Sequence, residues 1–261
     1  MTTSNAGSSQ NVLPYENAEY YEPSKDKIQN FKKLMMSIRN GETGLLNKYI
    51  EDNGDVNLRL LWYGGEFCPE ITLLMIACQH DHYIILEKLI SVRADIHAQD
   101  EYGRTALHYA ANNGSVKNCD ILIKNGAFIN QPASKICYRL LGPNTSISSG
   151  SKETALHEAC NRGFLDVVKF LIAKGADINV KNKYDETPIE KCESKWFEPS
   201  KEELEVKSYL QNYIKKRNIS AIIIQNAFRS ARYNPDYKMC QKMQKEYLEN
   251  EIRKIYNDLK A

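Results

Sequence analysis

Residues 105–111 read TALHYAA, and residues 154–160 read TALHEAC. Two further segments follow the same pattern in part, TLLMIAC at 72–78 and TPIEKC at 187–192. When the four segments are aligned on their threonines, successive copies begin 33, 49 and 33 residues apart. A motif that recurs at a fixed spacing indicates a chain built from repeated structural units.

A second marker keeps the same spacing. RADIHAQ begins at Arg93, GAFINQ at Gly126 and GADINV at Gly175, and their alanines are again 33 and 49 residues apart. An earlier, degenerate copy is GDVN at 54–57, which precedes ADIH by 40 residues. The two markers together predict about five units of about 33 residues, with insertions of about 7 residues after the first and about 16 after the third.

Each unit has the local signals of two short helices joined by a turn. The threonine is a good N-cap for a first helix whose leucine and alanine positions pack inward. A glycine turn follows, and the second helix, FLDVVKFLIAKG at 164–175 in the fourth unit, repeats its apolar residues at helical spacing. Its final glycine can adopt the left-handed conformation that ends a helix. One such unit cannot bury its apolar face alone, so the units are expected to stack into a solenoid.

Over about residues 28–213 these units resemble ankyrin repeats. The resemblance rests on Gly103-Arg104-Thr105-Ala106-Leu107-His108, on the Asn113-Gly114 turn and on Gly175-Ala176-Asp177. It implies an all-α solenoid of helix-turn-helix units with hairpin fingers, followed by C-terminal helices. It also implies structural roles for four residues, the histidines tying neighbouring turns together by hydrogen bonds: Thr105, His108, Thr154 and His157.

The repeat boundaries divide the chain into three parts. Residues 1–27 are polar and are expected to form a flexible leader, and residues 28–213 form the solenoid of about five units. The long insertions lie near 58–69 and 131–151. Residues 214–261 form a helical tail, which contains the segment 220–238 discussed below.

Both insertions fall in the finger connection between units, so they are expected at the same edge of the solenoid. They carry aromatic, aliphatic and arginine side chains of the kind that anchor protein interfaces. The predicted partner-binding residues of the fingers are Leu60, Trp62, Tyr63, Phe67, Tyr138, Arg139 and Leu140. The alternative is that the insertions fold back and cover the solenoid edge, with Trp62 filling a gap between units.

The tail segment AIIIQNAFRSARY, from Ala221, resembles an IQ motif, which calmodulin and related light chains bind. The resemblance implies that an EF-hand partner contacts Ile224, Gln225, Phe228, Arg229 and Arg232. The second half departs from the motif, because Ser230 replaces the usual glycine and Pro235 interrupts the helix. The alternative is a capping helix that lays Ile222, Ile223 and Ile224 on the fifth unit.

Composition narrows the class of protein. Lys and Arg number 35 and Asp and Glu 33, so the net charge gives no general attraction to nucleic acid or to anionic membranes. The seven cysteines are scattered without metal-ligand or disulfide spacing, which favours reduced thiols in a cytoplasmic or nuclear protein. No signal peptide or membrane span is expected.

No catalytic signature is present, since phosphate loops, GxSxG elbows and dinucleotide fingerprints are all missing from the sequence. We therefore expect no enzyme activity, no cofactor and no metal. The expected function is a protein-interaction module, a scaffold or adaptor, that binds a protein through its fingers and concave face and calmodulin or another EF-hand protein through its C-terminal helix. The alternatives are a regulator or effector that modulates a specific enzyme, and a DNA-associated regulator.

Overall fold

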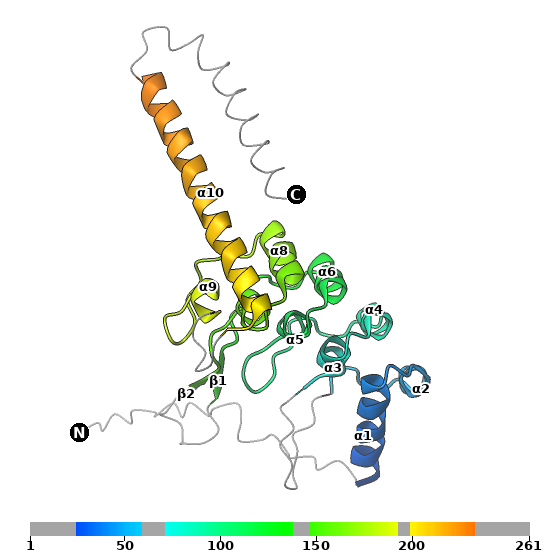
Figure 1. Cartoon of the computed structure of the whole chain (residues 1–261). Coiled ribbons are helices and arrows are strands. Elements are labelled where there is room, and N and C mark those ends of the chain that lie inside the picture. The colour runs from blue at the N-terminus through cyan, green and yellow to red at the C-terminus, as the bar shows by residue number, and fades with distance from the viewer. Residues whose placement is uncertain (1–24, 59–70, 138–146, 193–198, 233–261) are drawn as a thin grey trace, which may run out of the picture.

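The computed structural model describes residues 25–58, 71–137, 147–192 and 199–232. These residues form five helix pairs, in agreement with the expected repeat solenoid (Figure 1). The pairs are α1 (Lys25–Arg39) with α2 (Gly44–Glu51), α3 (Leu73–Gln79) with α4 (Tyr83–Ser91), α5 (Ala106–Asn112) with α6 (Val116–Lys124), α7 (Ala155–Asn161) with α8 (Leu165–Ala173), and α9 (Pro188–Lys191) with α10 (Lys201–Arg232).

The cap residues begin the helices where the sequence pattern places them. Thr72 accepts a hydrogen bond from the Met75 N–H at 3.3 Å at the start of α3. Thr187 and Glu190 form a reciprocal capping box at the start of α9. Since each cap satisfies backbone N–H groups that have no partner within the helix, each unit defines its own helix start.

The turn between the two helices of a unit needs glycine where the next unit comes close. Gly114 has a φ of +77°, and a Cβ atom there would lie 2.8 Å from the ring of Phe164. Phe164 occupies the N-cap position of α8, in the following unit. The turn therefore brings units three and four together as well as reversing the chain.

The first helices α1, α3, α5, α7 and α9 pack side by side in chain order, and α4, α6, α8 and α10 form a second row (Figure 1). The core lies between the rows, and leucine, isoleucine, alanine and cysteine side chains fill it. Each unit contacts chiefly its neighbours in the sequence. Stability is therefore built up from one junction to the next, as expected of a solenoid.

One finger contains the strands β1 (Lys135–Cys137) and β2 (Ile147–Ser149). They pair antiparallel, with Lys135 opposite Ser149 and Cys137 opposite Ile147. At the hairpin base, the Ala133 N–H donates to the Glu153 carbonyl at 2.7 Å, and the Lys183 N–H of the next finger donates to the Ser151 carbonyl at 2.7 Å. The described part of the long insertion is thus tied to its neighbour through the backbone.

Helix α10 serves as the second helix of the fifth unit and then continues outward as one 32-residue helix (Figure 1). Val206 and Leu210 are buried, and the helix packs on α7, α8 and α9. Ile222 and Ile223 are 55% and 44% exposed, so the alternative in which they cap the solenoid is wrong. The reason is length, because α8 has only 9 residues and the distal half of α10 extends past its end.

Across the described ranges, no helix has both the length and the hydropathy that a membrane crossing requires.

Candidate functional site

His108 and His157 join neighbouring units. The Thr105 N–H donates to His108 Nδ1 at 3.1 Å, and His108 Nε2 donates to the Glu153 carbonyl of the following finger at 3.0 Å. His157 repeats this geometry with the Thr154 N–H at 3.1 Å and the Glu186 carbonyl at 3.1 Å. Each ring therefore spans a helix start and the next unit.

Protonation agrees with this geometry. Burial lowers the pKa of His108 to about 4 and also lowers the pKa of His157. A neutral ring with a proton on Nε2 matches both neighbours, because a carbonyl only accepts and the Thr105 N–H only donates. Both rings are buried and their nitrogens are engaged, so neither is placed to act as a general base.

Four cysteines lie in the same core: Cys78, Cys119, Cys160 and Cys192. Burial raises the pKa of Cys119 to about 12 and raises the pKa of the Cys78 and Cys160 thiols. Since the thiolate is the nucleophile and the metal ligand, these groups are unreactive in the folded protein. Among the described residues, no three His, Cys, Asp or Glu side chains gather closely enough to hold a metal ion.

A polar network lies between α5 and the finger that joins α4 to α5. The buried Asp100 carboxylate is 2.8 Å from Arg104 Nε and accepts from the Tyr109 hydroxyl at 2.8 Å. The Arg104 guanidinium also lies over the ring of Tyr102, 5.2 Å from its centroid. Because Asp100 holds Arg104 and Tyr109 together, the partly exposed Arg104 has a defined position beside the exposed Tyr102.

The network continues along the first helices. The Asn112 side-chain N–H donates to Glu158 Oε2 at 2.7 Å, and the Arg162 guanidinium donates to Asn112 Oδ1 at 3.3 Å. Burial raises the pKa of Glu158. Further along, Lys191 lies 2.8 Å from a carboxylate oxygen of Glu153. The first helices of units three to five therefore carry ordered polar side chains.

Tyr102 and Tyr184 are the exposed aromatic residues of this surface. Each lies three residues before a cap threonine, so they occupy the same position in the repeat, at the tips of two fingers. Sequence reasoning concentrated on the long insertions and missed both residues. Alignment on the cap threonines contained the signal that would have found them. We call Tyr102, Arg104, Glu158, Arg162 and Tyr184 the finger-tip surface.

The residues predicted in the long fingers, Leu60, Trp62, Tyr63, Phe67, Tyr138, Arg139 and Leu140, lie outside the described residues. In the tail, Gln225 is an exposed residue of α10. Ile224, Phe228, Arg229 and Arg232 belong to the same helix, and their side chains lie outside the described ones. The structure therefore leaves these contact residues as predictions.

The projecting part of α10 combines apolar and basic residues. Ile219, Ile222 and Ile223 lie three and four residues apart and are all exposed, which places them on one face of the helix. Lys215, Lys216 and Arg217 precede them and are exposed too. From Val206 to Arg232 the helix contains no acidic residue. This half of α10 is therefore basic and partly amphipathic.

Comparison with protein-family models agrees with the repeat geometry. A model described as "Ankyrin repeats (3 copies)" matches residues 34–133, and one described as "Ankyrin repeat" matches residues 151–183. Together they cover just over half of the chain. The chain belongs to the ankyrin-repeat family. Repeats of this family are in general non-catalytic interaction domains, so the repeats indicate a protein-interaction module.

Several curated ankyrin-containing proteins are similar over short segments. The "Probable E3 ubiquitin-protein ligase XBOS33" of Oryza sativa subsp. japonica is 32% identical over 91 residues, 34% of this chain and 16% of that protein. The "Putative ankyrin repeat protein FPV244" of fowlpox virus is 40% identical over 52 residues, 20% of this chain and 8% of that protein. The "ADP-ribosylation factor GTPase-activating protein AGD4" of Arabidopsis thaliana is 38% identical over 56 residues, 22% of this chain and 7% of that protein. The matched segments span less than a fifth of these relatives.

Proposed function

We propose that this ankyrin-repeat chain is a scaffold or adaptor that holds a protein partner on the finger-tip surface. The observation that supports it most directly is the pair of exposed tyrosines, Tyr102 and Tyr184, at equivalent finger tips. The Arg104 guanidinium, which Asp100 holds in place, lies over the Tyr102 ring. Tyrosine and arginine are the residue types that dominate binding energy at protein interfaces.

Rigidity favours this surface as a binding site. Arg104 is held by Asp100 and Tyr109 before any partner arrives, and Glu158 is held by Asn112. Side chains that are already ordered lose little conformational entropy when they bind. The partner chemistry that fits is a protein segment with apolar side chains for the tyrosines and charged groups of both signs for Arg104, Arg162 and Glu158.

The test compares partners captured by the full chain and by the double variant Tyr102→Ala with Tyr184→Ala, quantified by mass spectrometry. A specific partner should bind the double variant at least about tenfold more weakly, which is the loss expected for truncated hot-spot residues. The matched control is Ile84→Ala, which truncates an exposed side chain on α4 and should leave capture unchanged. If the double variant and the wild-type chain capture the same proteins in the same amounts, the finger-tip surface is not the binding site.

The same experiment separates the alternatives. Capture of one dominant enzyme, with a change in its activity when the chain binds, would favour a regulator or effector over a scaffold. A DNA-associated regulator would shift duplex DNA in a strongly salt-dependent manner, because phosphate contacts release counterions. The near balance of 35 basic and 33 acidic residues argues against this second alternative.

The projecting half of α10 supports a second binding site, for calmodulin or a related EF-hand protein. Its exposed isoleucines and its basic residues without a neighbouring acid suit a helix that enters an apolar groove with an acidic rim. The likeness of residues 220–238 to an IQ motif supports the same partner class. Because α10 extends away from the solenoid, a partner could surround this part without displacing the fifth unit (Figure 1).

Titration of the full chain with calmodulin, with and without calcium, tests the second site. We expect binding at micromolar concentration, and we expect the double variant Ile222→Asp with Ile223→Asp to weaken it without loss of folding, since both side chains are exposed. The control is Leu204→Asp, an exposed residue in the first turn of the same helix. If the wild-type chain binds calmodulin neither with nor without calcium, α10 is not a calmodulin site.

A further inference from the structure

The turns that follow the second helices are joined by a ladder of side-chain amides. Asn57 Oδ1 accepts from the Asp95 N–H of the next unit at 2.7 Å. Two units later, Asn130 Oδ1 accepts from the Asp177 N–H at 2.8 Å. The equivalent pair at the junction between them is His97 and Phe128, whose rings lie 4.4 Å apart instead. The ladder is therefore interrupted at the junction of units two and three.

A second hydrogen bond is missing at the same place. In the other three turns an aspartate carboxylate accepts from the N–H two residues later, each time at 2.9 Å. The three bonds are Asp55 from Asn57, Asp95 from His97 and Asp177 from Asn179. Phe128 occupies the aspartate position in the remaining turn, and its side chain has no hydrogen-bond acceptor. Within the described part of the chain, neither the Phe128 N–H nor the Asn130 N–H donates a hydrogen bond.

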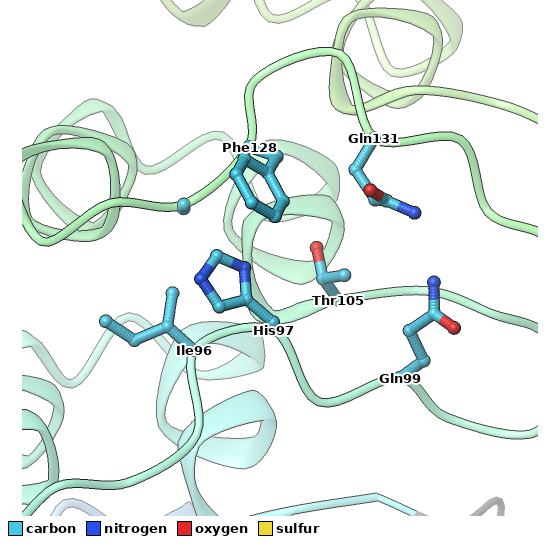
Figure 2. Close-up of a pocket in the computed structure, with 7 residues that line it drawn as sticks. Ile96, His97, Gln99, Thr105, Phe128 and Gln131 are labelled. Carbon is cyan, nitrogen blue, oxygen red and sulfur yellow. The ribbon is translucent and has the colours of Figure 1, made fainter.

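The interrupted junction also contains a small pocket. Figure 2 shows the rings of His97 and Phe128 side by side, with Thr105, Gln99 and Gln131 beyond them. Ile96 and Ala127 complete the apolar part of the lining. The Phe128 side chain is 62% exposed at a position where the neighbouring units carry a solvated carboxylate. An exposed ring beside a pocket and two backbone donors is a combination that the other turns do not have.

We propose that this junction binds an extended segment of a protein partner in which an apolar residue precedes an aspartate. The aspartate carboxylate accepts from the Asn130 N–H, as Asp95 and Asp177 accept within their own turns. A backbone carbonyl of the segment accepts from the Phe128 N–H, in the place of the amide carbonyl that Asn57 and Asn130 supply elsewhere. The apolar side chain covers the Phe128 ring and reaches the pocket.

This inference rests on the proposed function only in assuming a protein partner, and it uses a different surface. The chemistry is complementary, because two donors without internal acceptors meet two acceptors, and an exposed ring meets an apolar side chain. The Asn130 N–H needs an acceptor, and lysine has none in its side chain. A segment with lysine in place of the aspartate should therefore not bind.

The probe is the synthetic peptide acetyl-Gly-Leu-Asp-Gly-amide, titrated into the isotope-labelled full chain to about 10 mM, a range suited to the weak affinity of so small a ligand. We expect saturable shifts of the Phe128 and Asn130 amide resonances in nuclear magnetic resonance spectra. The control peptide acetyl-Gly-Leu-Lys-Gly-amide should leave both resonances unchanged. Absence of a saturable shift with the aspartate peptide, or equal shifts with both peptides, would overturn the proposal.

The matched variant is Phe128→Asp, which restores the carboxylate of the neighbouring turns. It should fold and should lower peptide affinity at least about tenfold, because the chain then supplies its own acceptor and loses the ring. Phe128→Ala is the second variant, which removes the ring but leaves both donors, and it should weaken binding less. Tyr184→Ala should leave peptide binding unchanged, so the two surfaces fail or succeed separately. Unchanged affinity in Phe128→Asp contradicts the assigned site.

Discussion

Replacement of His108 by alanine tests how the units are held together. The ring is fully buried, bonds to the Thr105 N–H at 3.1 Å and lies 3.0 Å from the Glu153 carbonyl. Its loss leaves a buried donor and a buried acceptor unpaired, each costing about 1–3 kcal/mol. We therefore expect the free energy of unfolding to fall by about 3–5 kcal/mol at pH 7, measured from urea denaturation followed by circular dichroism.

The difference in the free energy of unfolding between the wild-type chain and His108→Ala should depend on pH, which provides an internal check. The pKa of His108 is about 4 in the folded chain and 6.5 as its ordinary value, so the unfolded chain binds the proton first as the pH falls. Stability that depends on the neutral ring is present above pH 6.5 and is lost as the pH falls toward 4. The difference between wild-type and His108→Ala should therefore shrink by about 2 kcal/mol between pH 7 and pH 4.5.

The control is His97→Ala, because His97 is an exposed histidine in the turn that follows α4. It should cost less than about 1 kcal/mol, because the ring is exposed and contacts Phe128 across the junction without a hydrogen bond. A loss below about 1 kcal/mol for His108→Ala, or a difference that does not change with pH, would refute the assignment of His108 as a neutral tie between units.

Three further predictions concern other parts of the chain. Gly150→Ala should destabilise the protein by about 2 kcal/mol or more in thermal melts, because the Gly150 φ is +120° and a Cβ atom would lie 2.3 Å and 2.5 Å from two carbonyl oxygens. The control is Gly126→Ala, which has open space around it and should cost only about 1 kcal/mol in the same melts. Ile222→Asp should leave the urea midpoint unchanged whereas Val206→Asp should lower it strongly, and equal effects would mean that the distal half of α10 is packed. The four buried cysteines of the core should react with a thiol reagent at pH 8 only after denaturant is added, and rapid labelling of all four in the native chain would contradict their burial.

The repeat architecture could be predicted because its determinants are local. Thr72 and Thr187 begin their helices through bonds to residues three positions later, and Gly114 reverses the chain within one unit. Such signals recur at a fixed spacing, and they do not depend on the rest of the fold. The expected structural roles of His108 and His157 came from the family resemblance, whereas their bonds to the carbonyls of the next finger are visible only in the structure.

The candidate surfaces were harder to predict. Tyr102 and Tyr184 look like ordinary turn residues in the sequence, and only the exposed finger tips beside an ordered Arg104 make them candidates. Phe128 stands in a repeat position that sequence reasoning treated as one more copy of the marker. Its importance comes from the hydrogen bonds that its neighbours make and that it cannot make.

By itself the sequence determined the solenoid and its period, because capping, turn formation and packing on a neighbouring unit are encoded within about 33 residues. Only the tertiary structure decided the course of α10, since a helix that begins as the second helix of the fifth unit stays buried only as far as α8 extends beside it. The same holds for the junction at Phe128. Whether a side chain or an N–H is exposed depends on what lies next to it in space, and a pattern along the chain does not contain that information.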